Sequence, residues 1–254
     1  MKIDLLDITF LIPVRIDSIF RIENLLAIVN FLNFFFNTKI IVLEAASYDN
    51  SLLSSLLATK ADYYFLEDKD PIFYKTKYLN IMTSMVKTPF LSLWDADIVV
   101  PKNQIIDSLM KLRTYEYDVS FPYNGKCWSV SKIIRICYLT DILDIEFLEN
   151  NRNKMCQMYQ GDMYGGAIFL NTEKYICAGK ENEKFYGWGP EDAERYFRWK
   201  NLKYNIYRNE GDLFHLYHPR DMNGMFRSKD YESKVCGELS TIMNSSYDEI
   251  LDII

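Results

Sequence analysis

Hydrophobic positions in the first hundred residues alternate between continuous apolar runs and apolar residues at helical spacing. A short continuous run predicts a buried strand, whereas apolar residues three or four positions apart predict an amphipathic helix. The predicted strands are residues 8–14, 39–44, 61–66 and 91–94, and the helices between them are residues 19–36, 51–59 and 74–86. Strands that alternate with helices are typical of a mostly parallel sheet flanked by helices, so the sequence predicts an α/β fold.

The second part of the chain has a less regular pattern. A helix is expected at residues 104–114 and a strand at residues 118–122. Residues 123–158 include helical stretches such as 133–148, and this region would suit a lid or an acceptor-binding insertion.

The chain contains no Pro-, Gly- or Ser-rich linker that would divide it. We therefore expect a single domain over residues 1–254. Within it, a nucleotide-binding half of about 1–100 would precede an acceptor and catalytic half of about 101–254.

Composition excludes several classes of protein. Hydrophobic residues make up 49% and charged residues 25% of the chain, which is typical of a soluble globular protein. The net charge of -6 argues against a nucleic-acid binder. No uncharged stretch reaches the ~18 residues of a membrane span. Residues 1–10 contain two acidic residues and lack the basic region that precedes the apolar run of a signal peptide, so we do not expect a signal peptide there. The five cysteines form no Cys-x-x-Cys pair and predict reduced, mostly buried thiols, so we expect a cytoplasmic protein.

Two carboxylates, Asp95 and Asp97, follow directly after the strand at 91–94. Open α/β sheets bind ligands beyond the carboxyl ends of their strands. Oxygen ligands suit Mg²⁺ or Mn²⁺, and such a cation neutralises a diphosphate. The alternative is a solvated acidic loop.

Gly165 and Gly166 come directly before an apolar run at residues 167–170. A glycine pair allows the backbone to approach a ligand closely, and the alternative is a bulge or a tight turn.

The segment Gly187-Trp188-Gly189-Pro190-Glu191-Asp192 precedes a helical pattern, and Pro190 fits the first helical position. Glu191 and Asp192 then lie in the first turn, where ionised carboxylates are favoured, and such a carboxylate can accept a proton from a sugar hydroxyl. Trp188 would stack on a sugar ring when the loop closes. The alternative is a well-capped helix after a mobile loop.

His215 and His218 are the two histidines of the chain. Imidazole nitrogen added to carboxylate oxygen favours Mn²⁺ over Mg²⁺. In an extended segment, residues three apart face opposite sides, so we expect one histidine to bind the cation and the other to pack or form a hydrogen bond.

Taken together, these segments resemble glycosyltransferases with the GT-A fold, in particular the β-1,4-galactosyltransferases and the related chondroitin-type polymerases. The resemblance rests on residues 10–15, 95–97, 164–166 and 187–192 and on His218, and it covers most of the chain.

The resemblance implies roles for individual residues. Asp97, His218 and also His215 would bind Mn²⁺, with Asp95 near the ribose or the metal. Asp192 would be the catalytic base.

Other residues would shape the binding sites. Glu191 and Trp188 would form the sugar pocket, and Gly166 would lie against the donor sugar. The nucleotide would be bound by Pro13, Val14 and Arg15, and Glu44 would approach the uracil.

Three positions depart from the family pattern. Asp17 replaces a second arginine, Pro190 replaces a glycine, and Met163 replaces an aromatic residue that influences the choice of donor. The identity of the donor sugar therefore does not carry over.

The implied function is an inverting, Mn²⁺-dependent (or Mg²⁺-dependent) transfer from a UDP-sugar to a hydroxyl of a carbohydrate acceptor, in bacterial surface polysaccharide synthesis. A glycoside hydrolase also uses two carboxylates but needs no metal. A non-catalytic nucleotide-sugar or carbohydrate-binding module of a polysaccharide assembly complex is the third hypothesis.

The terminal residues 247–254 place Tyr247, Ile250, Leu251 and Ile254 on one helical face. That face would contact the inner face of the membrane or the polysaccharide machinery, or pack on its own domain.

Overall fold

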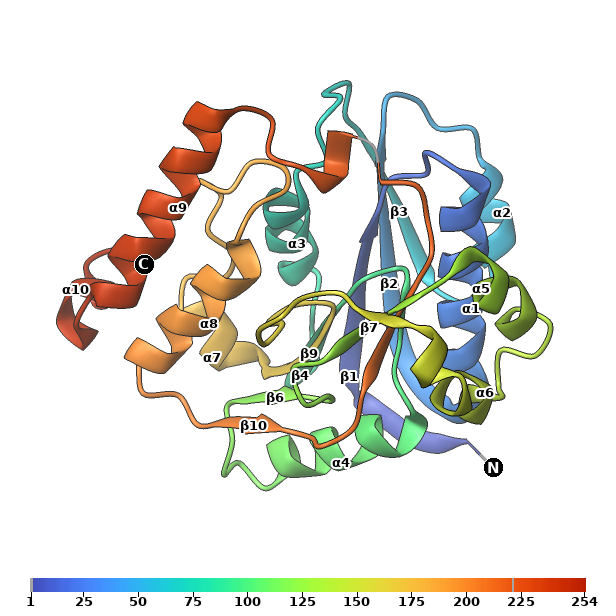
Figure 1. Ribbon diagram of the computed structural model, residues 1–254. Helices are drawn as coiled ribbons and strands as arrows, with labels where there is room; N and C mark the ends of the chain where they lie inside the picture. The colour runs from blue at the N-terminus through green and yellow to red at the C-terminus, as the bar shows by residue number, and fades with distance from the viewer. Residues whose placement is uncertain (1, 221) are drawn as a thin grey trace.

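A seven-stranded sheet runs through the computed structural model, which describes residues 2–220 and 222–254 (Figure 1). The strand order is β10-β6-β9-β4-β1-β2-β3. Their bounds are β1 Ile3–Val14, β2 Phe36–Ala46, β3 Asp62–Glu67, β4 Phe90–Trp94, β6 Val119–Phe121, β9 Ala167–Asn171 and β10 Ile206–Arg208. Among these strands, β9 alone runs antiparallel to its neighbours, β4 and β6. The predicted α/β fold with a mostly parallel sheet is confirmed.

Strand β1 lies inside the sheet because its apolar run is buried on both faces. Phe10, Leu11 and Ile12 are fully buried, and β1 pairs in parallel with β2 and β4. The strand begins at Ile3, earlier than the expected start at residue 8. Asp4 and Asp7 interrupt the apolar run there, and this is also where the register with β2 is irregular.

Helices cover both sides of β1, β2 and β3. In Figure 1, α1 (Ile19–Phe35) and α2 (Leu52–Leu57) lie on one side, and α3 (Lys75–Thr83) lies on the other. Outside residues 123–158, the other helices are α4 Lys102–Arg113, α7 Thr172–Cys177, α8 Glu191–Asn201, the 3-10 turn η2 Met222–Gly224, α9 Lys229–Asn244 and α10 Tyr247–Leu251. Helices α8 and α9 pack side by side beyond α3.

A second, four-stranded sheet joins distant parts of the chain. Its order is β5-β11-β7-β8, with β5 at Ile98–Val99, β11 at Leu213–Leu216, β7 at Cys127–Val130 and β8 at Cys156–Gln157. His215 pairs with Ile98 in antiparallel register, and the Leu216 amide donates to the Asp97 carbonyl over 2.8 Å. This pairing carries the late histidine segment to the acidic end of β4.

The region at residues 123–158 is helical over only part of the stretch expected at 133–148. It contains β7 and β8, helices α5 (Lys132–Tyr138) and α6 (Ile145–Asn150), and the 3-10 turn η1 (Arg152–Lys154). The pattern breaks because the Asp144 side chain caps a new helix by accepting from the Phe147 amide over 3.1 Å.

The cysteine prediction was wrong in part. Cys127 is buried, but Cys137, Cys156, Cys177 and Cys236 are exposed. The exposed four lie on short or peripheral helices and on strand β8 at the edge of its sheet, positions that the spacing of cysteines does not reveal.

The helices that the structure describes include none that is long and apolar enough to cross a membrane. On α10, Ile250 is fully buried, whereas Tyr247 and Leu251, with the following Ile254, are exposed. The terminal face is therefore partly packed on the protein and partly free. The proposed division into two halves of one domain stays a prediction.

Candidate active site

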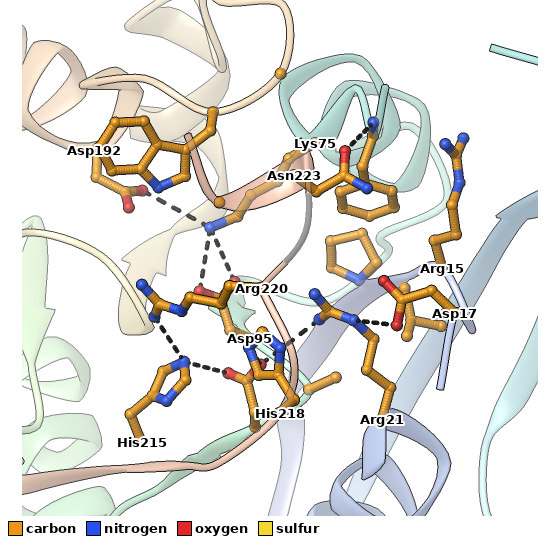
Figure 2. A pocket seen from close by; sticks show the side chains of 18 of the residues that line it. Arg15, Asp17, Arg21, Lys75, Asp95, Asp192, His215, His218, Arg220 and Asn223 are labelled. Atoms are coloured by element: carbon orange, nitrogen blue, oxygen red, sulfur yellow. Dashed lines mark hydrogen bonds and ion pairs between the residues drawn. The ribbon is translucent and has the colours of Figure 1, made fainter. Parts of the chain in front are cut away.

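One pocket opens beyond the carboxyl ends of β1 and β4 (Figure 2). Most of the residues that the sequence singled out line it, although they come from four separate segments. They are Pro13, Val14, Arg15, Asp95, Asp97, Trp188, Glu191, Asp192, His215 and His218.

Asp97, His215 and His218 form a compact cluster in this pocket. One ligand atom from each lies within 4.8 Å of the others. His218 Nε2 is 3.0 Å from Asp97 Oδ2, and His215 Nε2 is 3.6 Å from Asp97 Oδ1. All three residues are at least nine-tenths buried.

The expectation that the two histidines face opposite sides was wrong. Strand β11 ends at Leu216, so the alternation of an extended segment does not continue to His218. His218 lies in the irregular segment after this strand, and both imidazoles reach the same carboxylate.

A hydrogen bond orients one of the two imidazoles. His218 Nδ1 lies 2.7 Å from the Pro219 carbonyl, which can only accept, so Nδ1 donates to it and the ring is held with Nε2 toward Asp97. Burial lowers the pKa of His215 to about 4, despite the opposing effect of Asp97, so this imidazole is neutral at pH 7. Burial would raise the pKa of Asp97, but His215 and His218 hold it well below its ordinary value. One carboxylate oxygen and two imidazole nitrogens are a ligand set that fits Mn²⁺.

Two arginines that the sequence did not single out flank this cluster. Arg21 Nη1 is 3.7 Å from Asp97 Oδ2, and its Nε donates to Asp17 Oδ1 over 2.9 Å. Arg220 Nη2 donates to His215 Nε2 over 3.0 Å (Figure 2). The four-residue spacing from Asp17 to Arg21 indicates a pair on one helical face, and this could have identified Arg21.

Lys75, at the start of α3, was also missed. Its Nζ lies 2.9 Å from Asp95 Oδ1 and 4.0 Å from Asp192 Oδ1. Burial would lower the pKa of Lys75, but Asp192, Asp95 and Glu191 raise it above its ordinary value. The lysine therefore stays charged and joins the acidic end of β4 to the start of α8 (Figure 2).

Asp95 is consequently paired with Lys75 and lies outside the three-residue cluster. Burial raises the pKa of Asp95, and the neighbouring Asp97 and Asp192 add to this effect against Lys75.

Asp192 lies in the first turn of α8, as expected, although Pro190 is the N-cap and not the first helical residue. Arg195 Nη2 donates to Asp192 Oδ1 over 2.6 Å. Burial would raise the pKa of Asp192, but Lys75 and Arg195 outweigh it and hold the pKa below its ordinary value. Asp192 is thus ionised at neutral pH.

Glu191 behaves in the opposite way. Burial and the adjacent Asp192 raise its pKa to about 8, and its Oε2 is buried without a hydrogen-bond partner among the described residues. A pair of neighbouring carboxyl groups with separated pKa values is a common arrangement for acid and base roles. At pH 7 the ionised Asp192, and not Glu191, is equipped to accept a proton.

Glu44 lies in a neighbouring hollow that Arg15 also lines. Burial raises the pKa of Glu44, and the Tyr63 hydroxyl donates to its Oε2 over 2.7 Å. Arg15 is fixed by the carbonyls of Ala45 and Asp70, to which it donates over 2.8 and 2.7 Å.

Gly166 supports the pocket through its backbone. Its φ of +84° favours glycine, and its carbonyl accepts from the Asp95 amide over 2.8 Å. Met163 and Ile98 pack against it, which explains why no larger residue fits there.

Trp188 lines the pocket and meets Phe226 edge to face, with ring centroids 4.7 Å apart.

Comparisons with known proteins show what the chain is similar to. Residues 148–221, which include Gly166, Asp192 and both histidines, match the family described as the N-terminal domain of galactosyltransferase. The chain has the GT-A fold, and in this segment it is similar to galactosyltransferases. No curated protein sequence matches it.

Solved structures with this fold resemble the chain over most of its length. A Drosophila β-1,4-galactosyltransferase 7 mutant, in complex with manganese, UDP-galactose and xylobiose, has a TM-score of 0.53 and 15% identity, with 88% of this chain and 77% of that chain covered. The catalytic domain of the same enzyme with xylobiose has a TM-score of 0.52 and 16% identity over the same shares. Staphylococcus aureus TarS with UDP-N-acetylglucosamine has a TM-score of 0.61 and 11% identity, with 98% and 69% covered. The fold and the matched segment together support a glycosyltransferase enzyme.

Proposed function

We propose that the protein transfers a sugar from a UDP-sugar to a hydroxyl group of a carbohydrate acceptor, with inversion at the anomeric carbon. The observation that carries this proposal is one pocket with two distinct parts. A buried Asp97, His215 and His218 cluster lies on one side, and the ionised Asp192 lies on the other.

Asp97, His215 and His218 would hold Mn²⁺, or Mg²⁺ in its place. The bound cation would offset the negative charge of the diphosphate as a Lewis acid. The two similar structures named above with UDP-sugars, one of them with manganese, support this choice of donor and metal.

Arg21 and Arg220 add positive charge beside this cluster. Guanidinium groups suit phosphate oxygens, so we assign both arginines to the diphosphate. Arg21 would replace the second arginine that the family pattern carries at the position of Asp17.

Pro13, Val14 and Arg15 would bind the nucleotide, with Glu44 at the uracil and Asp95 near the ribose. Arg15 and Asp17 line both the main pocket and the hollow around Glu44, and the nearness of the two supports the assignment. Gly166 and Trp188 would border the donor and acceptor sugars.

Asp192 would accept the proton of the acceptor hydroxyl as the oxygen forms its bond to the anomeric carbon. The bond from that carbon to the diphosphate oxygen breaks with its electron pair, and UDP leaves. Glu191, protonated at neutral pH, would shape the sugar pocket without competing for this proton.

We further propose a role in bacterial surface polysaccharide synthesis, in the cytoplasm. Tyr247, Leu251 and Ile254 remain exposed and would allow contact with the membrane surface or with a polysaccharide-assembly partner.

A panel of UDP-sugars, namely UDP-galactose, UDP-glucose, UDP-N-acetylglucosamine and UDP-N-acetylgalactosamine, tests the proposed function. We expect one of them to raise the melting temperature in the presence of Mn²⁺ and to release UDP slowly. Stabilisation without any UDP release, with acceptor sugars present, would indicate a binding module. Sugar release from oligosaccharides without nucleotide would indicate a glycoside hydrolase.

A further inference from the structure

A buried chain of polar side chains leads from helix α7 to the carboxylate of Asp192. The Tyr175 hydroxyl donates to Glu181 Oε1 over 2.7 Å, and Arg195 Nη1 donates to Glu181 Oε2 over 2.5 Å. The other terminal nitrogen of Arg195, Nη2, donates to Asp192 Oδ1 over 2.6 Å. One guanidinium therefore joins an interior carboxylate to the carboxylate at the pocket.

This chain of contacts is almost sealed from solvent. Tyr175 and Arg195 are 1% exposed and Glu181 is 4% exposed, whereas the Asp192 side chain is 27% exposed. The network thus starts in the interior and ends at the pocket wall.

Glu181 is fixed through its backbone as well as its side chain. Its amide donates to Asn80 Oδ1 over 2.9 Å, and its carbonyl accepts from Asn80 Nδ2 over 3.0 Å. Since Asn80 belongs to α3, which also carries Lys75, both cations that face Asp192 are tied to one helix.

Resting on the proposed function, in which Asp192 is the base, we propose that Arg195, anchored by Glu181, is a positioning residue that holds the Asp192 carboxylate in its reactive orientation. Arg195 donates a hydrogen bond to Oδ1 of Asp192. The other carboxylate oxygen, Oδ2, lies against Gly165 and is left to accept the proton of the acceptor hydroxyl.

A fixed guanidinium also keeps the base ionised. The charged or titratable groups that face Asp192 are Lys75 from α3, Asp95 after β4, Tyr123 after β6, and Glu191 and Arg195 from α8. Of the two cations, Lys75 is 4.0 Å away and shared with Asp95, whereas Arg195 is in direct contact. Loss of Arg195 would therefore raise the pKa of Asp192, because it removes both a charge and a hydrogen bond that lower this pKa.

The test compares Arg195→Met with Arg198→Met. Arg198 lies one turn later on α8, is equally buried and pairs with Glu194 over 2.9 Å, but does not contact Asp192. UDP release from the most active UDP-sugar of the panel is measured against pH at saturating Mn²⁺. In the pH profile of kcat/KM, the fall on the acidic side (the acidic limb) should lie about one to three pH units higher in Arg195→Met than in Arg198→Met. Acidic limbs at the same pH in the two variants would overturn the proposal.

Two further variants separate orientation from charge. Arg195→Lys keeps the positive charge and is expected to return the acidic limb toward its wild-type position. Glu181→Gln leaves Arg195 beside Asp192 but weakens its anchor, so kcat should fall while the acidic limb and the affinity for UDP–Mn²⁺ stay unchanged. Full kcat in Glu181→Gln would remove Glu181 from the proposal.

If Arg195→Met does not fold, the double variant Glu181→Leu/Arg195→Met replaces the buried ion pair by apolar side chains, an exchange that is often tolerated. The ¹³C carboxyl shift of Asp192, assigned by its loss in Asp192→Asn, follows the same titration without turnover. Turnover retained in Asp192→Asn would refute Asp192 as the base. If Asp192→Asn loses turnover but the acidic limb of Arg195→Met stays at its wild-type pH, only the positioning role of Arg195 is refuted.

Discussion

Asp192 Oδ2 occupies the space in which a side chain at Gly165 would begin. A Cβ atom at position 165 would lie 1.9 Å from this oxygen and 2.4 Å from the carboxyl carbon. The glycine pair that opens β9 therefore makes room for a carboxylate of α8.

The first prediction concerns Gly165→Ala. The added methyl group would push the Asp192 carboxylate from its place, and a displacement of about 1 Å can cost a factor of about 10² in rate. We expect kcat to fall by about that factor while the affinity for UDP–Mn²⁺, measured by calorimetry, stays within about twofold.

Gly161→Ala is the matched control, because a Cβ at position 161 meets no atom within 4 Å. It should leave kcat unchanged. Equal activity of the two alanine variants would show that Asp192 tolerates displacement.

The second prediction separates base from ligand. Asp192→Asn keeps the shape of the side chain but cannot take up a proton, so transfer should fall by about 10² to 10⁴-fold. Affinity for UDP–Mn²⁺ should be retained, since Asp192 lies outside the Asp97, His215 and His218 cluster. A parallel loss of binding and turnover, measured by calorimetry and UDP release, would argue against the base role.

The third prediction concerns the metal cluster. Asp97→Ala removes the oxygen ligand between the two histidines, and UDP binding in Mn²⁺ should weaken by more than about 10²-fold. Binding of UDP with EDTA present should be the same in the variant and the wild type. If Mn²⁺ strengthens UDP binding equally in both proteins, Asp97 is not a ligand.

The fourth prediction is a pH dependence of stability. The pKa of Glu191 is raised from 4.5 to about 8 by burial and by Asp192. Above pH 4.5 the Glu191 carboxyl group loses its proton in the unfolded chain, whereas in the folded chain it keeps the proton until about pH 8. The folded state then binds more protons, so the free energy of unfolding decreases as the pH rises through this window.

Glu191→Gln has no such proton to lose. We expect the free energy of unfolding, measured with urea in the presence of EDTA, to rise in the variant relative to the wild type as the pH increases from 4.5 to 8. A difference that is constant over this range would mean that Glu191 titrates normally in the folded protein.

The regular part of the fold could be predicted because its pattern is local. The apolar runs that became β1, β2 and β4 are buried on both faces, and their hydrophobicity alone marks them as central strands. Strand β5 has only two residues, Ile98 and Val99, and its partner β11 lies far away in sequence, so no local pattern indicates their pairing.

The candidate site was accessible from the sequence where a residue type implies chemistry by itself. Asp97, His218 and Asp192 are of this kind. Lys75 and Arg195 were missed because they act through neighbours that only the folded chain supplies, and a lysine or arginine on a helix is usually solvated.

The pairing of β11 between β5 and β7 has a consequence for synthesis of the protein. The histidines reach Asp97 only after the chain has been made as far as residue 218, because β11 must first insert between two strands formed much earlier. A nascent polypeptide therefore lacks two of the three residues of the proposed cation cluster until residue 218 has been made. Under the proposed function, translation products that stop before this residue would be inert.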